Sequence, residues 1–151
     1  MTWAQVMAAV ETDLVAAGAT LDPQILSVRQ GEPDTVSVPL IAYWYEGDRE
    51  SLTGGNTLTR TNLEEGIRVR IYRPGSIRAP VKDAGWEVWL REANRAVKDA
   101  LWGDFTVGGT DPIGIDLDAT STTWLIVGDA LCLTAEFVLW IDLAEVDTIA
   151  P

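Results

Sequence analysis

An amphipathic helix over residues 83–103 is the feature that most constrains the fold of this chain. Its apolar residues recur every three or four positions, which places them on one helix face; they are Trp86, Trp89, Leu90, Ala93, Val97, Ala100 and Leu101. Asp83 can cap the first turn, and Gly103 stands where a helix commonly ends. Such a helix spans roughly 28 Å at about 1.5 Å per residue, so its tryptophan stripe needs an apolar platform of similar length.

The end of the chain supplies that platform as a predicted β-hairpin. Residues 122–127 and residues 130–143 predict strands, with a Gly-Asp turn between them. One side of the second strand is an unbroken apolar row, formed by Leu131, Leu133, Ala135, Phe137, Leu139, Ile141 and Leu143. Its other side carries Val138 and Trp140, and is therefore more apolar than a solvated surface requires.

A second amphipathic helix is predicted for residues 2–17, with Thr2 as its N-cap and Gly18 at its end. A strand follows over residues 36–45, which are rich in β-branched and aromatic types. Pro39 cannot donate a hydrogen bond to a ladder, which favours an edge strand or the start of a strand here.

The middle of the chain contains a further strand and a long connection. Residues 67–72 alternate between apolar and polar types and predict a strand that a Pro-Gly pair ends. Residues 46–65 before it are polar and include a Gly-Gly-Asn turn at residues 54–56. A connection of this length is usually functional or disordered. We interpret it either as a functional loop or as a mobile hairpin of two short extended arms.

Together these elements predict one α+β domain over residues 1–151. Its sheet is expected to be mainly antiparallel and four-stranded, with two helices packed on one face and a long strand-connecting loop. The other face would then be open, and it would carry Arg68, Arg70, Tyr72, Val138 and Trp140. Aromatic residues and arginine are enriched at protein interfaces. The two arginines are interpreted either as a solvated surface or as contacts for a partner's carboxylates.

The residue types exclude several kinds of site. There is no histidine and one cysteine, so the chain has no Ser-His-Asp triad, no His-rich zinc site and no disulfide framework of its own. Cys132 is interpreted as a small strand side chain. Asp116 and Asp118 match part of a calcium loop that lacks its glycine and distal glutamate, which favours a turn-rich loop. We expect no cofactor; paired carboxylates, as in a small hydrolase, are the only catalytic groups left.

Charge is distributed unevenly along the chain, whose net charge of −12 argues against nucleic-acid binding. Residues 1–48 carry one cation and seven acids, residues 49–98 ten cations and six acids, and residues 99–151 ten acids and no cation. The fold either mixes these segments into an ordinary acidic surface or leaves a cationic middle that meets the anionic end of a neighbour. With no basic leader and no long apolar run, we expect a soluble, cytosol-made chain without a membrane partner.

The order of these elements resembles the tail terminator proteins of long-tailed phages. The resemblance covers nearly the whole chain as a pattern of elements and includes no diagnostic motif. After the N-terminal helix and around the long polar loop, it is carried by VSVPLIAYWYEGD, GIRVRIYRPG, WEVWLREANRAVKDALWGD and TTWLIVGDALCLTAEFVLWIDL.

The resemblance implies a hexameric ring that caps the tail tube, stops its polymerisation and provides the surface on which the head connector docks. The implied partners are other copies of the chain, the tail tube protein and the head-tail connector protein. The implied location is the tail or neck of the virion, after assembly in the host cytoplasm. No catalytic residue is implied. Another phage neck protein, such as a head-completion or stopper protein, is the alternative within this class.

In such a ring, one side of each protomer meets the opposite side of the next. Segregated charge suits contacts of this kind, because like faces repel and unlike faces attract. The residues that we predict to contact partners combine the cationic middle of the chain with one exposed aromatic residue, and they are Arg49, Arg60, Arg68, Arg70, Arg73 and Trp140.

Overall fold

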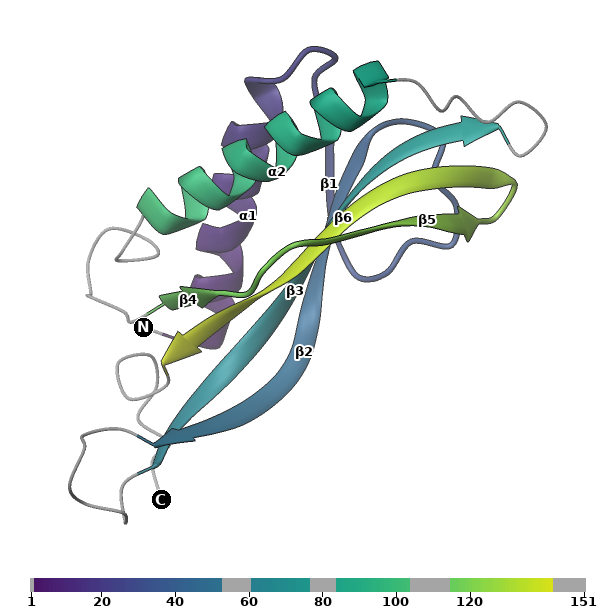
Figure 1. Ribbon diagram of the computed structural model, residues 1–151. Coiled ribbons are helices and arrows are strands. Elements are labelled where there is room, and N and C mark those ends of the chain that lie inside the picture. The colour runs from purple at the N-terminus through teal and green to yellow at the C-terminus, as the bar shows by residue number, and fades with distance from the viewer. Residues whose placement is uncertain (1, 53–60, 77–83, 104–114, 143–151) are drawn as a thin grey trace.

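The computed structural model describes residues 2–52, 61–76, 84–103 and 115–142 of the chain (Figure 1). Two helices pack together on one face of a six-stranded, mostly antiparallel sheet, which confirms the predicted α+β class (Figure 1). The elements are α1 (Trp3–Ala19), β1 (Ser27–Gln30), β2 (Leu40–Leu52), β3 (Thr61–Ser76), α2 (Ala84–Gly103), β4 (Ile115–Leu117), β5 (Ser121–Val127) and β6 (Ala130–Asp142).

The sheet has two more strands than the four predicted. Its order is β1-β2-β3-β6-β4, and β5 also pairs with β6. The two additional strands are β1, which runs parallel to β2, and β4, which is antiparallel to β6. They have four and three residues, too few for an alternating pattern to stand out in the sequence.

Helix α1 begins where the sequence predicted, but it does not end there. Thr2 and Gln5 form a capping box, in which the Thr2 hydroxyl accepts from the Gln5 amide at 3.3 Å. The predicted end at Gly18 is wrong, because the helix continues to Ala19 and Gly18 is buried within it. A Cβ on Gly18 would lie 2.5 Å from the carbonyl oxygen of Ile25. The glycine therefore allows close packing of the following segment.

Helix α2 confirms the predicted amphipathic helix, although its proposed cap, Asp83, lies outside the described residues. Its buried face consists of Trp89, Leu90, Ala93, Val97 and Leu101. The predicted platform forms from Leu133 to Ile141: the inward rows of β3 and β6 join the two helices in the main core, while Leu131 is not part of this core cluster and Leu143 lies outside the described residues. Burial of this apolar surface is the principal source of stability for the fold.

Strand β3 is much longer than predicted, and β2 is shifted toward the C-terminus, because residues 36–39 of the predicted strand lie outside it and the strand continues to Leu52. Strand β2 starts at Leu40, directly after Pro39, so the proline lies at a strand start as one interpretation required. Most of the expected loop over residues 46–65 is ladder, which confirms the paired-arm interpretation for the described residues; the turn at residues 54–56 lies outside them. The prediction that Pro74 ends β3 is wrong. The ladder with β2 stops at Tyr72, so beyond it β6 is the single described strand that flanks β3, and a proline without an N–H is tolerated there.

A β-bulge in β2 divides its ladder with β3 into two parts. Tyr45 opposes Ile67 and Gly47 opposes Gly66, so Glu46 is an extra residue on the β2 side. Gly47 has a φ of 124°, a conformation that favours glycine. The extra residue exchanges the two faces of β2 beyond this point. The outer part of the ladder, residues 47–52 and 61–66, projects beyond the helices, and we call it the β2–β3 arm (Figure 1).

The second face of the sheet, away from the helices, is less open than predicted. Tyr72 and Val138 were expected to be exposed there, but Tyr72 is 0% exposed and Val138 is buried. The connection between β1 and β2 crosses this face, and its Val36 joins a small apolar cluster with Leu40, Ala42, Tyr72, Val127 and Cys132. The crossing segment thus covers the end of the face near the β5–β6 turn.

Candidate partner-binding surface

Four of the six residues predicted to contact partners lie on the second face of the sheet. Arg68 and Arg70 lie on β3, Arg49 on β2 and Trp140 on β6, and the strand register brings them onto one side. Arg73 has the opposite parity on β3, and Arg60 lies outside the described residues. The bulge at Glu46 is what allows Arg49 to share a face with Arg68.

Glu136 of β6 joins the two central arginines. Its Oε2 accepts from Arg68 Nη1 at 2.8 Å and from Arg70 Nη2 at 3.0 Å. A second carboxylate, that of Glu46 at the bulge, accepts a hydrogen bond from Arg68 Nη2 at 2.6 Å. Glu32, from the crossing segment, lies 3.3 Å from Arg70 Nη1. Both arginines therefore already have carboxylate partners within the chain.

Burial and hydrogen bonding act in opposite directions on these groups. Burial by itself raises the pKa of Glu136, but hydrogen bonds from Arg70 and Arg68 outweigh it and lower that pKa below its ordinary value. The hydrogen bond from Arg68 also lowers the pKa of Glu46. Hydrogen bonds from Glu46 and Glu136 in turn raise the pKa of Arg68, against the effect of burial. Glu46, Glu136 and Arg68 are therefore all charged near neutral pH.

Aromatic rings extend this network along the strands. The Arg70 guanidinium lies 5.1 Å from the centre of the Trp44 ring and 5.7 Å from that of Tyr72. Its Nη1 also donates to the Tyr72 hydroxyl at 3.2 Å. With these contacts the Arg70 side chain is only 14% exposed, and contact between a guanidinium and ring faces is favourable. Arg70 is therefore a packed residue rather than a solvated one.

A second cluster lies at the base of the β2–β3 arm. The Trp140 ring covers Gly66 so closely that a Cβ there would lie 2.7 Å from it. The Arg49 guanidinium also lies over this ring, 4.3 Å from its centre. Arg49 Nη2 is held by Glu64 at 2.8 Å and by Asp116 at 2.9 Å. We call Arg49, Glu64, Gly66, Asp116 and Trp140 the arm-base cluster.

The sequence reasoning missed the carboxylates of both clusters. Asp118 accepts from Trp140 Nε1 at 3.1 Å, and Asp116 binds Arg49, so both acids of the suspected calcium loop hold other side chains. Across the described part of the chain, no group of three or more acidic or cysteine side chains is arranged to hold a metal ion. A periodic pattern could place Glu136 on the correct face, but only strand register reveals its partners.

Arg73 belongs to a separate surface on the helix side of the sheet. Its guanidinium lies 4.6 Å from the Trp86 ring centre and 5.0 Å from that of Trp89, both on α2. Trp86 also stacks on Trp124 of β5, with ring centres 6.2 Å apart. These contacts fasten the start of α2 to the sheet.

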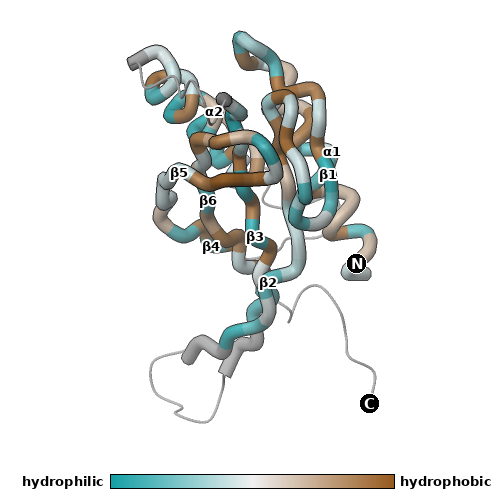
Figure 2. Tube along the Cα trace, turned by 90° about the vertical axis from the view of Figure 1, so that its right-hand side faces the viewer, coloured by the Kyte–Doolittle hydropathy of each residue, from teal (hydrophilic) through white to brown (hydrophobic). Residues whose placement is uncertain are grey.

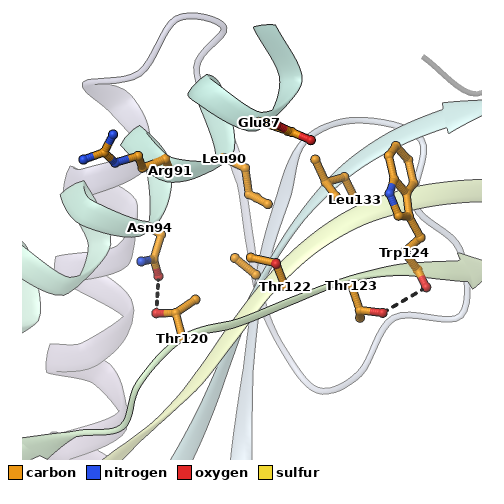
Figure 3. A pocket seen from close by; sticks show the side chains of 10 residues that line it. Glu87, Leu90, Arg91, Asn94, Thr120, Thr122, Thr123, Trp124 and Leu133 are labelled. Atoms are coloured by element: carbon orange, nitrogen blue, oxygen red, sulfur yellow. Dashed lines mark hydrogen bonds between the residues drawn. The ribbon is translucent and has the colours of Figure 1, made fainter. Parts of the chain in front are cut away.

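A groove of about 440 Å³ separates α2 from β5 (Figure 3). Leu90 and Asn94 approach it from the helix, and Asn94 Oδ1 accepts from the Thr120 hydroxyl at 2.9 Å. Among the described residues that line it, Glu87 is the single carboxylate. Since carboxylate-dependent hydrolysis requires two such groups about the scissile bond, these lining residues lack the geometry of that alternative.

No protein-family model matches this chain, and a comparison with curated proteins finds no match either. Neither α1 nor α2, the helices within the described residues, is long and apolar enough to span a membrane. The case for a function therefore depends on the geometry of the chain and on its pattern of elements.

Proposed function

We propose that this protein is a structural component of a phage tail, which forms a ring, expected to be hexameric, on the end of the tail tube. The ring would stop tube polymerisation and provide the surface for the head-tail connector. Its partners would be further copies of the chain, the tube protein and the connector protein. The observation that carries this proposal is the β2–β3 arm, which projects from a body whose sheet, in its described part, has two free edges (Figure 1).

The chemistry of the two clusters fits a structural role rather than a catalytic one. The arginines and carboxylates of the second face neutralise one another within the fold, and a lowered pKa at Glu136 is the opposite of what a general acid needs. This arrangement favours the interpretation in which folding mixes the three charge segments. That the arginines of the second face contact partners stays a prediction.

The arm-base cluster gives the arm a fixed direction. Arg49 comes from β2, Glu64 and Gly66 from β3, Asp116 from β4 and Trp140 from β6, so four strands meet at one stacked ring. A projecting hairpin by itself would be only marginally stable. Anchoring at its base lets the arm approach a tube or a neighbouring copy with little loss of conformational freedom, which favours binding.

An arm-shortening variant tests the proposal. Residues 51–62 are replaced by an Asn-Gly turn, which keeps Arg49 and Glu64 and therefore the base of the arm. Purified protein is added to tube protein during polymerisation, and tube lengths are measured by electron microscopy. The wild type should shorten the tubes, and the variant, with an unchanged melting temperature, should not. If the wild type leaves tube length unchanged, the proposal is wrong; if the variant caps normally, the arm is not the contact.

The alternative neck protein predicts a different result in the same assay. A protein on the connector side would leave tube length unchanged and would bind the isolated connector instead. Native mass measurement reports ring formation separately from tube capping and connector binding. Repeating it across salt concentrations shows whether charged contacts hold the ring, because such contacts weaken as salt screens them. A salt-independent monomer that neither caps tubes nor binds connector would contradict the whole class.

A further inference from the structure

Both edges of the sheet are free of a strand partner among the described residues. Within the same residues, strand β1 pairs only with β2, and β5 pairs only with β6. Free edges are templates for pairing with another chain unless they are protected. Ile126, the residue before the end of β5, is exposed, and β1 is preceded by Leu26, which is 83% exposed. The hydrophobic end of β5 faces the viewer in Figure 2. Exposed apolar residues thus lie at or beside both edges, and β1 itself also carries the exposed Arg29.

Each free edge lies beside a groove on the helix side of the sheet. The groove of Figure 3 separates α2 from β5, and its floor consists of Leu133 and Ala135. A groove of about 390 Å³ separates α1 from the β1 edge, between Ala8 and Gln30. The sheet is therefore wider than the two helices that cover it. A neighbour added at either edge would bring its own helix over the uncovered margin.

The outer sides of the two helices differ in a complementary way. Helix α1 contains no lysine or arginine, and beside its groove it presents the small exposed residues Ala4 and Ala8, with Glu11 as the single charge among the groove's described lining residues. Helix α2 presents Arg95 and Trp102, of which Trp102 is 48% exposed. Tryptophan and arginine are enriched at interfaces, and a small-residue surface leaves room for a large ring.

The spacing of these residues matches between the helices. Arg95 precedes Trp102 by seven residues, and Glu11 follows Ala4 by seven residues. The helices cross obliquely with opposite overall senses in one copy (Figure 1), so α2 of one copy would also have the opposite overall sense to α1 of a neighbour placed side by side. With Trp102 over Ala4 and Ala8, Arg95 then lies opposite Glu11, because both helices rise about 1.5 Å per residue.

We propose that a second copy of this chain occupies this surface, with β5 of one copy pairing antiparallel with β1 of the next. Trp102 of the first copy would pack on Ala4 and Ala8 of the second, and Arg95 would face Glu11. The contact joins opposite sides of the molecule, so it is heterologous and can close into a ring. This inference rests on the proposed function and names the surfaces through which its ring would form.

Paired cysteine variants test the geometry. In the proposed register, Val15 of one copy faces Arg91 of the next, and both side chains are exposed. Cys132 is buried, so the added thiols report alone. A mixture of V15C and R91C should give disulfide-linked dimers on oxidation, whereas either variant by itself should not. The double variant V15C/R91C should give a ladder of linked copies. Glu92→Cys replaces R91C as the control, since Glu92 lies on a different side of α2.

A charge-reversal cycle tests the ion pair independently. R95E and E11R should each raise the dissociation constant of the assembly several-fold. A mixture of the two variants, which restores opposite charges across the contact, should recover most of that loss. The exposed change E92R serves as a control for altered charge on α2 and should leave assembly unchanged. Circular dichroism melts show whether E11R, which also lies near Tyr43, keeps its fold.

The outcomes separate this inference from the proposed function. If native mass shows oligomers but V15C and R91C do not cross-link, the interface is wrong and the ring proposal stands. Self-linking of V15C would indicate an isologous contact and would also contradict the inference. If no oligomer and no cross-link form at any concentration, this interface is refuted, and the tube-capping assay then decides the proposed function by itself.

Discussion

Replacing Glu136 by glutamine tests whether the second-face network is a real determinant of the fold. The substitution keeps the shape of the side chain but removes the charge that Arg68 and Arg70 share. Breaking a buried ion pair costs about 3–5 kcal/mol. Glu136 is 17% exposed and Arg68 is 26% exposed, so solvent screens part of this interaction. We therefore expect a loss of about 2 kcal/mol in the free energy of unfolding.

Chemical denaturation and a thermal melt measure this loss directly. For a chain of this size, about 2 kcal/mol corresponds to a fall of about 4–8 °C in the melting temperature. The matched control is E92Q on the exposed face of α2, which should lie within about 0.5 kcal/mol of the wild type. If E136Q behaves like E92Q, the network is an ordinary solvated surface, and the arginines are free to bind a partner after all.

The same substitution predicts a pH dependence whose sign follows from the lowered pKa of Glu136. A carboxyl with a lowered pKa in the folded state stabilises the protein above its ordinary pKa of 4.5, and this contribution is lost as the pH falls through the folded pKa. The stability difference between wild type and E136Q should therefore be full at pH 7 and shrink below about pH 4. A difference that stays constant in acid would refute the ionic explanation.

Three close contacts give further predictions. G66A should lower the free energy of unfolding by about 1–3 kcal/mol, because its Cβ would clash with the Trp140 ring. Tryptophan fluorescence during denaturation reports both this stability loss and displacement of the ring. Y45F should remove the absorbance step at the highest pH of a tyrosine titration, because a hydrogen bond to Glu65 raises the pKa of Tyr45 to about 12; that bond stabilises the fold below about pH 10 and is lost as the pH rises through the folded pKa. G18A should destabilise the fold by about 1–2 kcal/mol despite the better helix propensity of alanine, since the backbone behind it cannot move away cheaply; a thermal melt that matches the wild type would contradict this.

Local periodicity was sufficient to predict the elements that form the main core. The tryptophan stripe of α2 and the apolar row of β6 each repeat with the period of their own element, so their buried faces follow from the sequence alone. The β5–β6 hairpin has a Gly-Asp turn of two residues, and it too forms as predicted. These features depend on neighbours in the sequence, which explains why they could be predicted.

The candidate surface depended on long-range pairing and was only partly predictable. The polar outer parts of β2 and β3 show no alternation, so the arm could not be distinguished from a loop. The carboxylate partners of Arg68 and Arg70 are far away in the sequence, and the position of Glu136 between them follows only from the register of β3 and β6. The prediction of an open face failed for a related reason: the segment that covers Tyr72 enters from β1, a strand too short to recognise.

The extra residue at Glu46 determines which side chains the arm presents on each of its faces. Deleting it would restore regular pairing and turn every β2 side chain beyond it to the other face, so Arg49 would leave Trp140. The presence of this one residue thus determines on which face of the arm each β2 side chain lies. Loss of this single residue would therefore give the arm a different exposed surface without any change in the body of the fold.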